Sequence, residues 1–315
     1  MPHPEAPVVA ALDIGGTKTA AALVTARGEI VGRATAPTPG QAGAEAILAT
    51  AAELVTRLGA APGAPPVRHL GVGSAGVIDP QRGVVVGATD VLVGWAGTPL
   101  AQKLEALTGM TTSVVNDVHA HALGDVAFGA GKGCATALFV GVGTGVGGSF
   151  IVDGAPLAGA HNAAGHIGHQ PSPYAGELPC SCGAVGHLEA FASGPGLHAE
   201  HARRAGAAVQ DLRAVAALAS AGDEIAAEVL RDGGAAVGSA IGGLVNVLDP
   251  HVVVVGGGVS EAGELWWEAL RSAVAGEVLP SLVDTPIAAS ALGTDAALVG
   301  AAALAWSTFA DKESS

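Results

Sequence analysis

The chain has 315 residues, of which 50% are hydrophobic and only 3% are aromatic. This length exceeds what one hydrophobic core usually organises, so we expect two lobes of ordinary domain size. The formal net charge is -14, from 28 acidic against 14 basic residues. Such a balance repels polyphosphate backbones at long range and argues against a nucleic-acid partner.

The three cysteines, Cys134, Cys180 and Cys182, offer no disulfide framework, because a bridge across one intervening residue would be strained. We therefore expect a reducing, cytoplasmic location. Residues 133–152 carry no charge over a length that could span a bilayer, but their glycines and hydroxyl residues are typical of turns between strands, so no membrane association is expected. Residues 1–7 lack a signal region and are predicted to form a short disordered leader.

Residues 8–24 form an apolar run, a short polar stretch and a second apolar run, which predicts a strand, a tight turn and a strand. Free backbone N–H groups at such a turn can cradle phosphates while Asp13 faces their magnesium ion. The alternative is a glycine-rich hairpin with one exposed acid. The polar stretch consists of Asp13, Ile14, Gly15, Gly16, Thr17 and Lys18.

This stretch resembles the first phosphate motif of the actin and sugar-kinase superfamily. Its residue sequence is similar to that of the motif in the ROK family of sugar kinases and sugar-responsive repressors. The resemblance implies a two-lobed α/β actin-like ATPase fold, of ribonuclease H-like type, with a nucleotide cleft between the lobes. We expect an N-terminal lobe over residues 1–118, joined by a C-terminal helix over residues 297–315, and a C-terminal lobe over residues 119–296.

Alternating strand and helix patterns along the chain agree with this fold class. Thr98 is predicted to cap a helix that has Pro99 at its first position. Further strands are expected at 29–35, 67–72, 112–115, 135–141 and 252–255, and further helices at 42–58, 118–128 and 297–309.

A second glycine hairpin at residues 141–148 echoes the first and resembles the second phosphate motif of ROK kinases, with Gly143, Thr144 and Gly145 as phosphate contacts. Its glycine spacing also fits a dinucleotide-binding fingerprint. That alternative needs a helix to start on the glycines, whereas a strand pattern follows them. Three further glycines, Gly256, Gly257 and Gly258, resemble the family's adenosine motif.

Asp117 follows a predicted strand and opens a predicted helix. A carboxylate there can hold an acceptor hydroxyl and take up its proton during phosphoryl transfer. Asp is also a strong helix N-cap, which is the alternative interpretation. The resemblance favours catalysis, because Asn116 and Asp117 match the ROK segment in which Asn and Asp bind sugar hydroxyls and Asp acts as the base.

Two thiols and several imidazoles in residues 166–189 suit a closed tetrahedral zinc site, with a metal-free loop as the alternative. The resemblance assigns the ligands as His169, Cys180, Cys182 and His187. His187 stands where the family usually has a third cysteine. An alternative ligand set has His166 in place of His169.

The resemblance also assigns sugar contacts to Gly76, His166, His169 and Glu189, beside Asn116 and Asp117. His166 occupies the place of a family glutamate that accepts hydrogen bonds from sugar hydroxyls. A neutral imidazole offers one donor and one acceptor where a carboxylate only accepts. This departure makes an amino or acylamino sugar a candidate beside glucose.

We therefore predict a sugar kinase that uses Mg-ATP to phosphorylate a hexose or an amino or acylamino hexose at the C6 hydroxyl, with glucose and N-acetylmannosamine as leading substrates, a structural zinc ion, and a homodimer as in related proteins. The alternatives are a catalytically silent sugar-binding protein of the family and a kinase for another amino sugar such as kanosamine. A repressor is disfavoured because only twelve residues precede Asp13.

Overall fold

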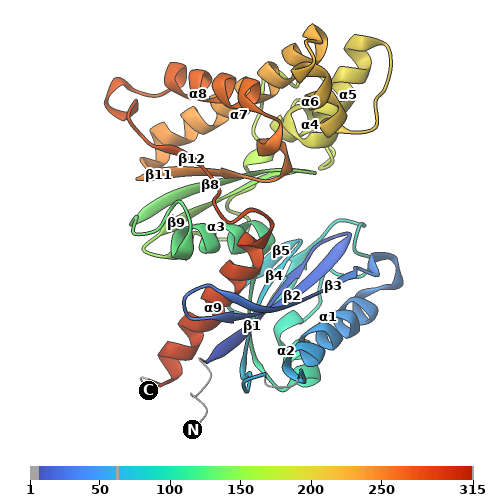
Figure 1. The fold of residues 1–315 in the computed structure, drawn as a ribbon, viewed down its shortest axis with the longest axis vertical. Helices are drawn as coiled ribbons and strands as arrows, with labels where there is room; N and C mark the ends of the chain where they lie inside the picture. The colour runs from blue at the N-terminus through green and yellow to red at the C-terminus, as the bar shows by residue number, and fades with distance from the viewer. Residues whose placement is uncertain (1–6, 62–63, 314–315) are drawn as a thin grey trace. The chain divides into compact units, whose positions relative to one another are not determined.

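The computed structural model describes residues 7–61 and 64–313. The predicted leader, except for Pro7, and the last two residues of the predicted terminal helix lie outside this range. Contacts divide the chain into two compact units (Figure 1). The first comprises Met1–Gly133, Gly154–Ala164 and Thr294–Ser315, and the second comprises Cys134–Asp153 and Gly165–Gly293.

The first unit is built on a mixed sheet with strand order β3-β2-β1-β4-β7. β1 pairs antiparallel with β2 and parallel with β4, which in turn pairs parallel with β7. The strands are β1 (Val8–Ile14), β2 (Lys18–Thr25), β3 (Ile30–Pro37), β4 (His69–Ser74) and β7 (Thr111–Asn116), beside a separate hairpin of β5 (Val77–Asp79) and β6 (Val84–Gly87). The helices are α1 (Ala44–Gly59), α2 (Leu100–Thr108), α3 (Asp117–Phe128) and α9 (Ala296–Glu313), and the two-residue strand β10 (Ala155–Pro156) belongs to the same unit.

Alternate residues of β1 face two different cores, because side chains alternate across a strand. Leu12 and Ile14 pack with α1 and α2, whereas Val9 and Ala11 pack with α9 on the other face of the sheet (Figure 1). Burial on both faces explains the unbroken apolar run in the sequence. The terminal helix α9 therefore belongs to the first unit.

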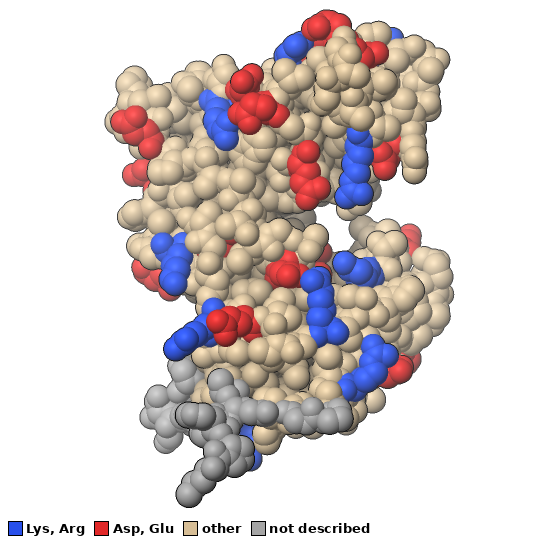
Figure 2. Space-filling model, in the orientation of Figure 1, with Lys and Arg blue, Asp and Glu red and all other residues tan. Residues whose placement is uncertain are grey.

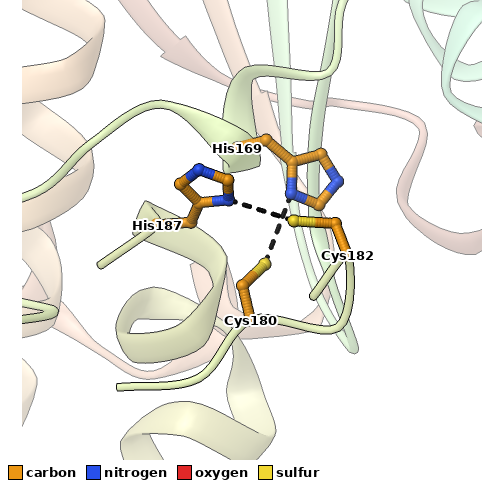
Figure 3. Close-up of side chains that lie close together, drawn as sticks. All are labelled: His169, Cys180, Cys182 and His187. Carbon is orange, nitrogen blue, oxygen red and sulfur yellow. Dashed lines mark hydrogen bonds between the residues drawn. The ribbon is translucent and has the colours of Figure 1, made fainter. Parts of the chain in front are cut away.

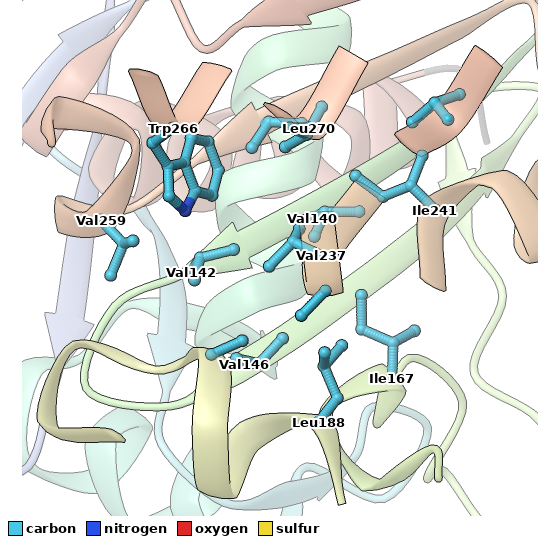
Figure 4. Close-up of a cluster of buried hydrophobic side chains, with 14 of the residues drawn as sticks. Val140, Val142, Val146, Ile167, Leu188, Val237, Ile241, Val259, Trp266 and Leu270 are labelled. Carbon is cyan, nitrogen blue, oxygen red and sulfur yellow. The ribbon is translucent and has the colours of Figure 1, made fainter. Parts of the chain in front are cut away.

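The second unit has the strand order β9-β8-β11-β12 in its sheet. Val140 and Val142 of β8 pack against Val237 of α7 and Trp266 of α8 (Figure 4). The strands are β8 (Thr136–Val142), β9 (Val146–Val152), β11 (Val252–Gly256) and β12 (Ile287–Ala289). The helices are α4 (Leu188–Ala192), α5 (Gly194–Ala205), α6 (Leu212–Ser220), α7 (Glu224–Leu248) and α8 (Glu264–Glu277).

Small residues let α7 and α8 approach closely. A Cβ atom on Gly234 or Gly238 would overlap the backbone carbonyls of Trp266 or Leu270. The small-residue spacing in α7 therefore serves packing within this unit. Within the described part of the chain, no helix combines the length and the apolar character that a bilayer span requires.

Two details differ from the sequence-based expectation. The contacts keep α3 with the first unit, so the division falls after Gly133 rather than after Val118, because α3 packs along α9. The predicted cap at Thr98 is wrong: Pro99 precedes the first residue of α2, and the Thr98 hydroxyl donates to the Gly94 carbonyl at 3.4 Å.

On the face drawn in Figure 2, acidic and basic side chains are interspersed, and the coloured residues form no basic stripe.

Candidate active site

The turn between β1 and β2 is held by its neighbours. The Gly15 amide donates to the Lys18 carbonyl at 3.1 Å, and the Thr38 hydroxyl donates to the Gly15 carbonyl at 2.8 Å. A Cβ atom on Gly16 would lie 2.7 Å from a methyl carbon of Val91. The end of β3 and the segment before α2 therefore fix the turn, with Thr17 and Lys18 exposed beside it.

Two carboxylates lie near the carboxyl ends of parallel strands in the first unit. Asp13 is the penultimate residue of β1, and Asp117 follows β7 directly and begins α3. Both strands pair with β4, so their ends share one edge of the sheet. Burial, and then the charge of Asp117, raise the pKa of Asp13 to about 6, while Lys18 opposes the shift. The charge of Asp117 therefore acts on the Asp13 carboxyl.

Because its pKa is raised, the ionised Asp13 carboxylate lowers the free energy of unfolding at neutral pH. Because the pKa in the folded protein, about 6, exceeds the ordinary value of 3.8, the folded state binds more protons between these values, and the free energy of unfolding falls as pH rises through that window. We expect Asp13→Asn to raise the free energy of unfolding by up to about 3 kcal/mol near pH 7 and by little near pH 4.

Urea unfolding at both pH values measures this effect, with Asp90→Asn, at an exposed aspartate of the same unit, as the control. The same stability gain at both pH values would show that ionisation of Asp13 is not its cause.

Asn116 is the N-cap of α3, which corrects the alternative that gave this role to Asp117. Its Oδ1 accepts from the amides of Val118 at 2.9 Å and His119 at 3.3 Å, and its Nδ2 donates to the Gly76 carbonyl at 2.9 Å. One oxygen of Asp117 also accepts from the Val118 amide at 2.9 Å. Three predicted sugar contacts therefore lie close together: Asn116 and Asp117 are adjacent in the chain, and Asn116 is hydrogen-bonded to Gly76.

The second glycine hairpin borders a cavity of about 480 Å³ that lies wholly within the second unit. The Gly143 amide donates to the Gly145 carbonyl at 2.8 Å, and the Gly143 carbonyl accepts from the Gly194 amide at 2.8 Å. Gly257 has a φ of 90°, and a Cβ atom there would overlap Val142. The cavity is lined by Gly143, Thr144, Gly194, Pro195, His198, Gln210, Asp211, Leu212, Arg213, Gly258 and Val259.

Of the predicted nucleotide contacts in this unit, Gly143, Thr144 and Gly258 line the cavity, while Gly145, Gly256 and Gly257 form the adjoining backbone. Sequence reasoning missed the walls supplied by the starts of α5 and α6. Signals for both helix starts exist, since Ser193 and Asp211 act as N-caps. Nothing in the sequence indicates that the two helix starts meet at one cavity.

Four predicted metal ligands converge in the second unit (Figure 3). Their ligand atoms all lie within 4.8 Å of one another, with Cys180 Sγ 3.4 Å from His169 Nδ1 and Cys182 Sγ 3.3 Å from His187 Nδ1. Zinc bonds of about 2.0 to 2.3 Å in a tetrahedron require similar separations. The set fits a structural zinc ion in donor type, number and spacing.

His166 lies outside this cluster, although its ring stacks on that of His169 with a centroid separation of 6.0 Å. The alternative with His166 as ligand in place of His169 is therefore not supported. Glu189, on α4, faces the second glycine hairpin: its Oε2 accepts from the Val146 amide at 2.9 Å. The sequence did not predict this contact.

The sequence model of the ROK family matches residues 9–308. The chain belongs to the ROK family. A glucokinase from Halalkalibacterium halodurans is 33% identical to this ROK protein over 305 residues, covering 92% of each chain. An N-acetylmannosamine kinase from Escherichia coli O139:H28 is 34% identical over 296 residues, covering 94% of this chain and 97% of the relative.

Solved structures agree with this family assignment. A ROK hexokinase from Thermus thermophilus superposes with a TM-score of 0.85 at 33% identity, covering 97% of this ROK protein and 100% of that chain. A ROK family glucokinase from Streptomyces griseus, in complex with glucose and AMPPNP, has a TM-score of 0.81 at 32% identity, covering 96% and 100%. The predicted actin-like ATPase fold is confirmed.

Proposed function

We propose that this ROK protein is an ATP-dependent kinase that transfers a phosphoryl group to a hydroxyl of a hexose or of an amino or acylamino hexose, at C6. The observation that carries the proposal is the pair of strand-end carboxylates beside the first glycine turn, where the charge of Asp117 helps to raise the pKa of Asp13. Relatives named glucokinase and N-acetylmannosamine kinase, each about a third identical over nearly the whole chain, support it.

In this proposal Asp117 is the catalytic base. Its carboxylate would accept the proton of the sugar hydroxyl as the hydroxyl attacks the γ-phosphate. The free N–H of the Asn116 amide, the Gly76 loop, His169 and Glu189 would hold the remaining hydroxyls. The Asn116 side chain is already fixed by three hydrogen bonds, which pre-organises the second N–H of its amide, for which the described residues provide no partner.

Mg-ATP is the proposed phosphoryl donor. Asp13 would face the magnesium ion, while Gly15, Gly16, Thr17 and Lys18 offer backbone N–H groups and one cation to phosphates. In the second unit, Gly143, Thr144 and Gly145 would contact phosphates, and Gly256, Gly257 and Gly258 would border adenosine. The cavity of about 480 Å³ has the size of a small-molecule site.

We also propose that His169, Cys180, Cys182 and His187 hold a structural zinc ion. A bound zinc ion would supply a fixed cross-link among these four side chains rather than reaction chemistry. His169 would then present its second ring nitrogen in a fixed direction. The remaining proposals are a homodimer, on the basis of the family, and a cytoplasmic location, which the three free cysteines support.

His166 is the residue that we propose to bias substrate choice. A carboxylate in its place would add an acceptor for sugar hydroxyls and remove a donor. We expect His166→Glu to shift the ratio of kcat/KM for glucose over N-acetylmannosamine about tenfold toward glucose, because one gained or lost hydrogen bond is worth that much in discrimination.

The experiment measures ADP release across glucose, mannose, N-acetylglucosamine, N-acetylmannosamine and amino-glucoses for the wild type and for His166→Glu. The control is His161→Glu, which makes the same charge change at another exposed histidine. An unchanged sugar ratio in the variant would remove His166 as a specificity residue. If the wild type released no ADP with any sugar of the panel, the kinase proposal itself would be refuted.

A further inference from the structure

We propose that Glu189 is a positioning residue that couples the metal-ligand loop to the second glycine hairpin. Binding of zinc to the four ligands would then determine how firmly the hairpin is held at the cavity. We define the metal-ligand loop as residues 180–185. The contacts that carry this proposal lie within the second unit. Its effect on ATP rests on the proposed kinase function.

Each oxygen of the Glu189 carboxylate accepts a hydrogen bond from a different segment. Oε2 accepts from the Val146 amide at 2.9 Å, and Oε1 accepts from the Ser181 hydroxyl at 2.8 Å. Val146 is the first residue of β9 and is 5% exposed. Its amide would lose a charged acceptor if the carboxylate moved, and such bonds are stronger than neutral ones.

The hairpin and the carboxylate cannot move independently. A Cβ atom on Gly145 would lie 2.6 Å from Oε2 of Glu189, so the hairpin backbone packs directly on the carboxylate. The carbonyl of Gly143 is held in turn by the amide of Gly194 at 2.8 Å. Glu189 on α4 and Gly194 on α5 therefore hold the hairpin at Val146 and at Gly143. Gly143 and the residue that follows it, Thr144, line the cavity.

The other end of the link lies between two metal ligands. Ser181 stands between Cys180 and Cys182 in a tight turn, in which the Cys180 amide donates to the Ala184 carbonyl at 2.8 Å and the Gly183 amide donates to the Cys180 carbonyl at 3.0 Å. A movement of either thiol therefore moves the Ser181 hydroxyl. Metal loading would fix both thiols, hence Ser181, Glu189 and the Val146 amide in turn.

The test measures hydrogen exchange of the Val146 amide by NMR on valine-labelled protein, without nucleotide or sugar, before and after EDTA removes zinc. In zinc-loaded protein we expect Ser181→Ala and Glu189→Ala to speed exchange about tenfold, as zinc removal does in the wild type. Glu189→Gln should stay close to the wild type, because its amide can still accept from Val146 and donate to the Ser181 oxygen.

The control is Ser220→Ala, which removes another exposed serine hydroxyl of the same unit, one that donates to the Ala216 carbonyl. It should leave exchange at Val146 unchanged. Wild-type exchange rates in zinc-loaded Ser181→Ala, or equal rates in the alanine and glutamine variants of Glu189, would overturn the coupling.

Steady-state kinetics give the second readout. Zinc removal should raise the KM for ATP about tenfold in the wild type, whereas in Ser181→Ala the KM starts high and rises less than about twofold on removal. An equal rise in both proteins would overturn the proposal. If no sugar is phosphorylated, the proposed function fails, and the exchange rates alone decide the coupling.

Discussion

Replacing Asp117 by asparagine is expected to lower kcat for sugar phosphorylation by a factor of about 10² to 10⁴, the usual contribution of a general base. Asparagine keeps the size of the side chain and a carbonyl oxygen that can accept from the Val118 amide, as the carboxylate does at 2.9 Å. It cannot take up the proton of the attacking hydroxyl. The start of α3 should stay intact, because Asn116 caps it.

The kinetic pattern distinguishes this role from a structural one. The KM for ATP and the unfolding midpoint should change little, and kcat should fall with each sugar that the wild type accepts. Asp90→Asn, at an exposed aspartate of the same unit, serves as the control and should keep full activity. If Asp117→Asn turned over at the wild-type rate, the base would have to be another group.

Loss of one metal ligand is the second large effect that we expect. Cys180→Ser should abolish stoichiometric zinc and loosen residues 166–189, because structural zinc adds on the order of 10 kcal/mol to the folding of small zinc modules. Cys180 is the buried thiol of the pair, so its loss opens the inner side of the cluster. Metal analysis and hydrogen exchange of this segment measure the two consequences.

The chain offers a matched control for this prediction. Cys134 is a free cysteine outside the cluster, and Cys134→Ser should keep both the zinc and the exchange protection. Equal zinc content in the two variants would contradict the ligand assignment. A zinc-free wild type with full activity and a protected segment would show that the four side chains form an ordinary hydrogen-bonded loop.

Strands and glycine turns are well predicted here because their signals are local. The apolar run of β1, the polar turn after it and the resumption in β2 follow directly from residues 8–24. The register that brings Asp13 opposite Gly73 of β4 depends on chain sixty residues away. Sequence spacing alone cannot supply such a pairing.

The candidate site shows the same limit. The group of four candidate metal ligands could be predicted, since two thiols and two imidazoles lie close together in one short stretch, and their ligand atoms lie within 4.8 Å of one another. The second bond of Asn116, to Gly76, and the bond of Glu189 to Val146 join segments about forty residues apart, and no local pattern marks them. The resemblance named Asn116 and Glu189 as sugar contacts, and the fold adds that each also supports a loop.

The central claim is that this ROK protein moves a phosphoryl group from ATP to a sugar. The most direct measurement incubates the zinc-loaded protein with Mg-ATP and each sugar of the panel, and follows ADP and the sugar phosphate by ³¹P NMR, with Asp117→Asn beside it. We predict equal amounts of ADP and a C6 phosphate ester for glucose or an acylamino or amino hexose, both lost in the variant. ADP without a sugar phosphate, or no product with any sugar, would contradict the claim.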